Sequence, residues 1–293
     1  MRSAAGLLSN PKALASVLSS RCGILLCGDF ETVDGAVWTV VRPEHLPRPN
    51  GFSIVVTRSP SHVSALFRLD TFGRELAEMM GFSGPEAHSS FAALVDVALT
   101  HDVTVSVIVN GQPNRVGPES PAVPWRSLEI ECDRWLPPTL RDNQLVERLA
   151  CDVAFTCLSL VLQLLVTREV NDEGVAGVYE GACTQVLVSK YERSAANRTA
   201  CILAHGTTCK VCGFQFGGLY GEIGENYIEV HHVTPLALMR GGMSVNPIRD
   251  LVPVCANCHA MFHRQSPPLA VDDLRSRLHR SLGATSIPTP PSD

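Results

Sequence analysis

The sequence predicts an α+β protein with two domains, and three observations carry this prediction. Segments rich in β-branched residues alternate with segments of helical apolar spacing through residues 1–170. A polar stretch that contains glycine, NDEGVAG at residues 171–177, then interrupts the apolar pattern. Beyond residue 190 lie six of the ten histidines and two pairs of closely spaced cysteines. We therefore expect a mixed α/β-rich domain of unrecognised type at residues 1–170, a linker at 171–188 and a second domain at 189–282.

The elements of the first domain follow from local patterns. Strands are predicted at residues 37–41, 52–57, 103–109 and 128–132, and helices at 70–80 and 91–99. A long helix should begin near Arg141. Its apolar part, residues 150–166, carries polar residues at i, i+4, i+7 and i+11. This spacing predicts a core helix with one polar stripe that contacts water, rather than a membrane span. These four residues are Asp152, Thr156, Ser159 and Gln163. A short amphipathic helix is expected at 272–282, before a disordered tail at 283–293.

Composition limits the classes of function. The apolar fraction of 45% and the charged fraction of 18% are typical of a soluble globular protein. From Lys190 onward there are ten Lys and Arg against eight Asp and Glu, whereas the preceding part has fourteen against twenty-one. A broad basic surface for nucleic acid is therefore not expected, and any phosphate contact must come from local patches or metal ions. The short apolar run at residues 24–27 does not resemble a signal peptide, so we expect a cytoplasmic protein without membrane contact.

Four of the eleven cysteines form two CxxC pairs. A CxxC turn places two thiolates on the same side of a tight loop, and two such turns can complete a tetrahedral zinc site. A site closed by four cysteines has no open position for a substrate, so we expect this zinc to be structural. The proposed ligands are Cys209, Cys212, Cys255 and Cys258. The other seven are expected to pack as small hydrophobic residues. They are Cys22, Cys27, Cys132, Cys151, Cys157, Cys183 and Cys201.

The histidines around the second pair suggest a further cation. His231 and His232 end an extended apolar segment, and adjacent side chains of a strand point to opposite faces. One of them can therefore bind a metal ion while the other faces a different neighbour. His259 and His263 are spaced i, i+4, which places both on one face of a helix.

The segment from His231-His232 through Arg249-Asp250-Leu251 to Cys-Ala-Asn-Cys-His resembles an HNH endonuclease of the McrA-like type over about a quarter of the chain. The resemblance implies a zinc-stapled ββα-metal HNH module that hydrolyses DNA phosphodiesters beside one divalent cation, Mg²⁺ or another such as Mn²⁺ or Ni²⁺. It implies that His232 is the general base, and that His231 and His259 are metal ligands. His263 is either a third ligand or a phosphate contact.

The central asparagine of the family motif corresponds here to Asp250, which is a departure from the family pattern. A carboxylate could accept a hydrogen bond from the imidazole of the base and fix its tautomer. Asn246 and Asn257 are rival candidates for the same position. Basic residues that could contact phosphate are Arg198, Lys210, Arg240 and Arg264, although Arg198 is as well explained by a solvated helix face.

The leading hypothesis is a DNA endonuclease of the restriction or defence kind, directed at modified DNA by its first domain. That extension rests on analogy with HNH enzymes that carry an upstream selecting domain. Trp38, Trp125, Trp135 and Phe52 could stack on a flipped base, but large aromatics are more often core residues. One site cuts one strand, which favours a homodimer. The alternatives are a zinc-dependent DNA-binding protein with an inactive centre and a nuclease toxin.

Overall fold

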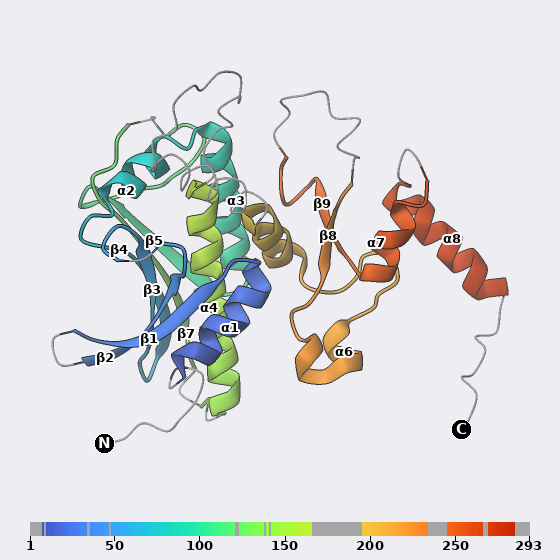
Figure 1. Cartoon of the computed structure of the whole chain (residues 1–293), viewed down its shortest axis with the longest axis horizontal. Coiled ribbons are helices and arrows are strands. Elements are labelled where there is room, and N and C mark those ends of the chain that lie inside the picture. Colours follow the sequence, from blue (N-terminus) through green and yellow to red (C-terminus); the bar gives the residue numbers. More distant parts are fainter. Residues whose placement is uncertain are drawn as a thin grey trace. The chain divides into compact units, whose positions relative to one another are not determined.

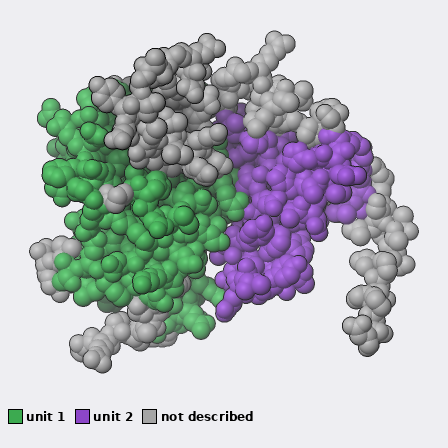
Figure 2. Space-filling model, viewed as in Figure 1, with its two compact units in different colours: residues 1–203 green, residues 204–293 purple. Residues whose placement is uncertain are grey.

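The protein forms two compact units, residues 1–203 and residues 204–293 (Figure 2). The structure is a computed structural model that describes residues 8, 10–33, 36–46, 48–120, 123–137, 139–140, 142–165, 195–233, 245–265 and 269–284. The predicted linker at residues 171–188 lies outside the described residues, and so does the predicted tail from residue 285 onward.

The first unit is built on a seven-stranded antiparallel sheet with the order β1-β2-β3-β4-β7-β5-β6 (Figure 1). The strands are β1 (Leu26–Val33), β2 (Ala36–Pro43), β3 (Phe52–Arg58), β4 (His62–Leu69), β5 (Val103–Val109), β6 (Gln112–Pro113) and β7 (Leu128–Trp135). All four predicted strands are present. The last of them extends three residues further than predicted, to Trp135, and it is inserted between β4 and β5.

Helices pack against this sheet and form the core with it (Figure 1). They are α1 (Pro11–Cys22), α2 (Arg74–Gly81), α3 (Pro85–Thr100) and α4 (Asn143–Leu165), and residues 195–205 form a further helix. The helix α4 contacts β3, β4 and β7. One row of buried side chains crosses five paired strands, namely Val41, Ile54, Phe67, Ile130 and Val107. Because paired residues share a face, this row forms one continuous apolar layer.

The prediction that the polar stripe of α4 contacts water is wrong, because three of its four polar residues are buried. The hydroxyls of Thr156 and Ser159 donate to carbonyl oxygens one helical turn earlier, at 2.9 and 2.7 Å. The Gln163 amide donates to the carbonyl oxygen of Ala196 at 2.9 Å. Each buried polar group is thus satisfied inside the protein, so the helix needs no contact with water. Asp152 alone is half-exposed, and it pairs with Arg21 at 2.8 Å.

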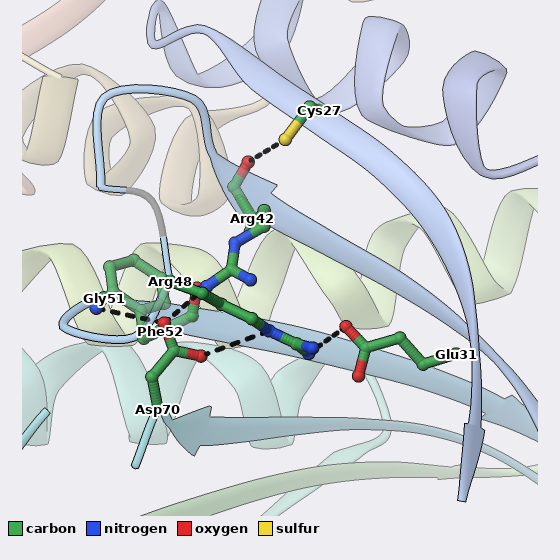
Figure 3. A network of polar contacts seen from close by, with 7 residues as sticks. All are labelled: Cys27, Glu31, Arg42, Arg48, Gly51, Phe52 and Asp70. Atoms are coloured by element: carbon green, nitrogen blue, oxygen red, sulfur yellow. Dashed lines mark hydrogen bonds and ion pairs between the residues drawn. The ribbon is translucent and has the colours of Figure 1, made fainter. Parts of the chain in front are cut away.

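The helix predicted from residue 70 begins only at Arg74, because Asp70 has another role. Its buried carboxylate accepts hydrogen bonds from the Gly51 amide at 3.0 Å and from the Arg42 guanidinium at 2.5 Å (Figure 3). Arg48 extends this network to Glu31 on β1. A Cβ atom on Gly51 would lie 2.3 Å from the carbonyl oxygen of Leu46, so this close turn requires glycine.

The aromatic and cysteine side chains of the first unit follow the expected burial, with exceptions. Phe52 and Trp125 lie in the core, Trp38 is half-buried and Trp135 is exposed, so these aromatics do not form one stacking surface. Cys27 is exposed on β1, contrary to the prediction that it packs in the core. Cys183 lies outside the described residues. The remaining cysteines of this unit are buried as expected.

The second unit contains a two-stranded antiparallel sheet and short helices (Figure 1). Its elements are α6 (Phe216–Tyr220), the 3₁₀ helix η2 (Gly221–Gly224), β8 (Glu229–His232), β9 (Leu251–Val254), α7 (Ala256–Phe262) and α8 (Val271–Ala284). The predicted amphipathic helix at 272–282 corresponds to α8. Among the described helices of the whole chain, none combines the length and the apolar character that a membrane crossing requires.

Candidate metal centres

Four cysteine thiols converge in the second unit. The sulfur atoms of Cys209, Cys212, Cys255 and Cys258 lie within 4.8 Å of one another, and the Sγ atoms of Cys212 and Cys255 are 3.7 Å apart. Four thiolates bound to one zinc ion at 2.3 Å are about 3.8 Å apart. The donor set and its spacing therefore fit a structural zinc ion.

The sequence forms this cluster through two local turns. Gly213 has a φ of +75° and donates its amide to the carbonyl oxygen of Cys209 at 2.9 Å, which closes the first CxxC turn. The second pair lies at the start of α7, where Cys255 is the N-cap residue. The Lys210 amide donates to the carbonyl oxygen of Pro253 at 2.9 Å and joins the two turns. Burial raises the pKa of the Cys212 thiol to about 11. At Cys209 burial also acts to raise the pKa, but backbone hydrogen bonds outweigh it and lower the pKa of that thiol.

Three imidazoles form a second cluster. Ligand nitrogens of His231, His259 and His263 lie within 4.8 Å of one another, and each pair of ring centroids is 5.2 Å apart. The His231 ring stacks on the buried Phe262 ring at 4.2 Å. Burial, followed by the charges of the neighbouring histidines, lowers the pKa of His231 to about 4. The imidazole is therefore neutral near pH 7, and its lone pair is available to a cation.

The strand β8 separates His232 from this cluster. Glu229 and His231 alternate with Val230 and His232 along the strand, so the two adjacent histidines point to opposite faces. His232 pairs across the sheet with Leu251, the residue that follows Asp250. Burial lowers the pKa of His232, and the nearby carboxylate of Asp250 partly opposes this shift. The ring is therefore neutral near pH 7 and able to accept a proton.

Hydrogen bonds fix the loop that carries Asp250. Its carboxylate accepts from the Asn246 amide at 2.9 Å and from Arg249 at 3.1 Å. Burial alone would raise the pKa of Asp250, but these contacts and His232 together hold it below its usual value. Among the described residues no hydrogen bond joins this carboxylate to His232, so the two groups interact through charge.

The rival candidates for the central position differ in their contacts. The side-chain oxygen of Asn246 accepts the amides of Ile248 and Arg249 at 3.1 and 3.0 Å, which makes it a cap for the loop. Asn257 is exposed on α7. Of the three, Asp250 alone comes directly before the strand that pairs with the histidines.

The predicted phosphate contacts are spread over both units. Lys210 and Arg264 are exposed residues of the second unit, and Arg264 follows His263 directly. Arg198 belongs to the first unit, where its side chain lies close to Gly23. Arg240 lies outside the described residues.

Two further residues of the site were not predicted from the sequence. The carboxylate of Glu229 lies 2.6 Å from Nδ1 of His259. The alternation of Glu229, Val230 and His231 along a strand could have indicated it, since it places the acid on the metal-facing side. His205, at the end of the helix over residues 195–205, lies with Nε2 2.6 Å from the carbonyl oxygen of Ile248 and holds the loop of Asp250. No local signal in the sequence marks this contact.

Comparison with known families agrees with this geometry. Residues 209–265 match the family described as HNH endonuclease, and this segment contains both clusters. Searches of curated proteins and of solved structures returned no match. Residues 209–265, which carry four cysteines suited to zinc, therefore form an HNH endonuclease domain.

Proposed function

We propose that this protein is a metal-dependent DNA endonuclease that acts in the cytoplasm, with its catalytic centre on β8 and α7. One observation carries the proposal. Three imidazoles converge on one side of β8, while His232 stands on the other side of the same strand. This arrangement can bring one cation and one general base to the same phosphodiester.

The residues have distinct roles in the proposed hydrolysis. His232 takes a proton from the attacking water, which requires a neutral ring, and burial lowers its pKa in the required direction. Asp250 stabilises the imidazolium that forms, because its negative charge lies close to the ring. His231, His259 and His263 hold the cation, which when bound would polarise the phosphate and stabilise the leaving oxygen.

The ligand set bears on the choice of cation. Imidazole nitrogens suit Ni²⁺, Zn²⁺ and similar ions, whereas Mg²⁺ prefers oxygen ligands. The described cluster offers three nitrogens and no carboxylate. We therefore expect Ni²⁺ to bind more tightly than Mg²⁺.

A narrower proposal concerns the substrate. A role in restriction or defence, with a preference for modified DNA, is supported by the resemblance to the McrA-like type and by the large separate first unit. Because one centre cuts one strand, we also propose a homodimer for double-strand cleavage. Cleavage of matched plasmids with and without cytosine modification, with the products resolved as nicked or linear, tests both points.

The test of the catalytic assignment is His232→Ala in a plasmid-nicking assay with Mn²⁺, Ni²⁺ or Mg²⁺. A general base contributes about 10²- to 10⁴-fold to a rate, so we expect nicking to fall at least about 100-fold. The variant should keep its zinc and its thermal stability. His101→Ala, which removes an exposed histidine of the first unit, is the matched control. Nicking by His232→Ala at the control rate would disprove the assignment.

A further inference from the structure

An acidic side chain contacts the histidine cluster from the same strand. Oε2 of Glu229 and Nδ1 of His259 are 2.6 Å apart, which is a short hydrogen bond between a carboxylate and an imidazole. Both side chains are about one-third exposed. The bond joins β8 to α7 directly beside the three imidazoles.

This contact determines which nitrogen of His259 can reach a cation. A neutral imidazole carries one proton, and a carboxylate can only accept a hydrogen bond. Nδ1 must therefore hold the proton, and the lone pair lies on Nε2.

The carboxylate is itself held by its neighbours. The Tyr227 hydroxyl donates to Oε1 of Glu229 at 3.4 Å, and the Tyr227 ring meets the Phe216 ring edge-to-face at 4.7 Å. The backbone of Glu229 pairs with Val254, the residue before the zinc-site Cys255. The position of Glu229 is thus tied to the second cysteine turn.

We propose that Glu229 is a positioning residue, which fixes His259 in the Nδ1-protonated tautomer and directs Nε2 toward the catalytic cation. The proposal deepens the proposed function and rests on its metal centre. It assigns Glu229 no contact with the substrate and no ligand bond. The cation loses affinity when Glu229 is removed because His259 is then free to rotate and to change tautomer.

The first measurement is of the tautomer and needs no second cation. Long-range ¹H–¹⁵N spectra of the full-length, zinc-loaded protein at pH 8 should show His259 with the proton on Nδ1. In Glu229→Ala we expect the ring signals to shift toward the tautomer mixture of a free histidine. Glu222→Ala, which removes another exposed carboxylate of the second unit, should leave them unchanged. A wild-type His259 protonated on Nε2, or one unaffected by Glu229→Ala, would overturn the proposal.

The second measurement is calorimetric titration of the same proteins with Ni²⁺ alone. Loss of such a supporting carboxylate lowers metal affinity about 10- to 100-fold, and we expect this loss in Glu229→Ala. Glu229→Gln keeps an acceptor oxygen and should recover part of the lost Ni²⁺ affinity. If Glu229→Ala loses its zinc, the comparison is made with Glu229→Gln instead. Wild-type affinity in both variants overturns the positioning role alone. Absence of Ni²⁺ binding by the wild-type protein would instead overturn the metal centre, and with it the proposal.

Discussion

Replacement of one zinc ligand should unfold the second unit and leave the first unit intact. In Cys209→Ala the cluster loses one of four thiolates, and Cys209 is a buried member with 2% exposure. Apart from the cysteines, the described buried hydrophobic residues of the second unit are Val211, Ile228, Leu251, Val254 and Phe262. Burial of these five residues contributes about 8–15 kcal/mol at most. A structural zinc ion contributes about 10–16 kcal/mol in small zinc modules. A zinc ion at the four cysteines would therefore stabilise this unit about as much as its apolar core does.

Three measurements on the full-length protein test this comparison. Zinc content should fall below one ion per chain in Cys209→Ala, and limited proteolysis should leave a fragment close to residues 1–203. Thermal denaturation should lose the transition of the second unit, and a chelator should produce the same change in the wild-type protein. Cys27→Ala removes the exposed cysteine of β1 and is the matched control. A Cys209→Ala protein whose second unit resists protease without bound zinc would refute the assignment of the four cysteines.

Two further predictions concern the stability of each unit. Asp70→Ala leaves the largely buried Arg42 side chain without its ionic partner and should destabilise the first unit by about 3–5 kcal/mol in urea unfolding. Glu78→Ala, which removes a half-exposed carboxylate, is the control and should cost under about 1 kcal/mol; equal losses would contradict the role of this network. The pKa of His231 is about 4 in the folded state, below its ordinary value of 6.5, so its contribution is complete above pH 6.5 and is lost as pH falls toward 4. In zinc-loaded protein without a second cation, this loss should reach about 3 kcal/mol for the second unit, and His231→Gln should show a shallower dependence of melting temperature on pH than the wild type. Identical pH profiles would exclude the lowered pKa.

Local patterns predicted individual elements better than their arrangement. The β-branched run at residues 103–109 is a strand in the structure, because Val side chains at every second position suit a sheet with one buried face. The position of β7 between β4 and β5 could not be predicted, because strand pairing depends on contacts distant in sequence. The burial of Thr156 and Ser159 was missed for a related reason. A hydroxyl that bonds to its own helix is compatible with the core, and spacing alone does not distinguish it from a solvated one.

The candidate site was largely predictable because its residues lie at short, chemically restrictive spacings. CxxC and an i, i+4 histidine pair each fix a geometry within one turn, so the side chains of both clusters could be named as candidate ligands without knowledge of the fold. Glu229 was missed because a glutamate in a strand is most often a solvated residue. Its significance depends on His259, thirty positions later in the chain, which packs beside it only in the folded unit.

The two candidate metal centres share α7, so this one short helix would position ligands of both. Cys258 and His259 are consecutive on the helix, so they point in directions about 100° apart. Cys258 joins the cysteine cluster and His259 joins the imidazoles. A rotation or slip of α7 would therefore disturb both centres at once. A zinc ion bound by the four cysteines would hold α7 against the turn of Cys209, and it would thereby fix the distance between His259 and His231 on β8. Such a metal would take the place of the large apolar core that would otherwise be needed to hold three imidazoles close together.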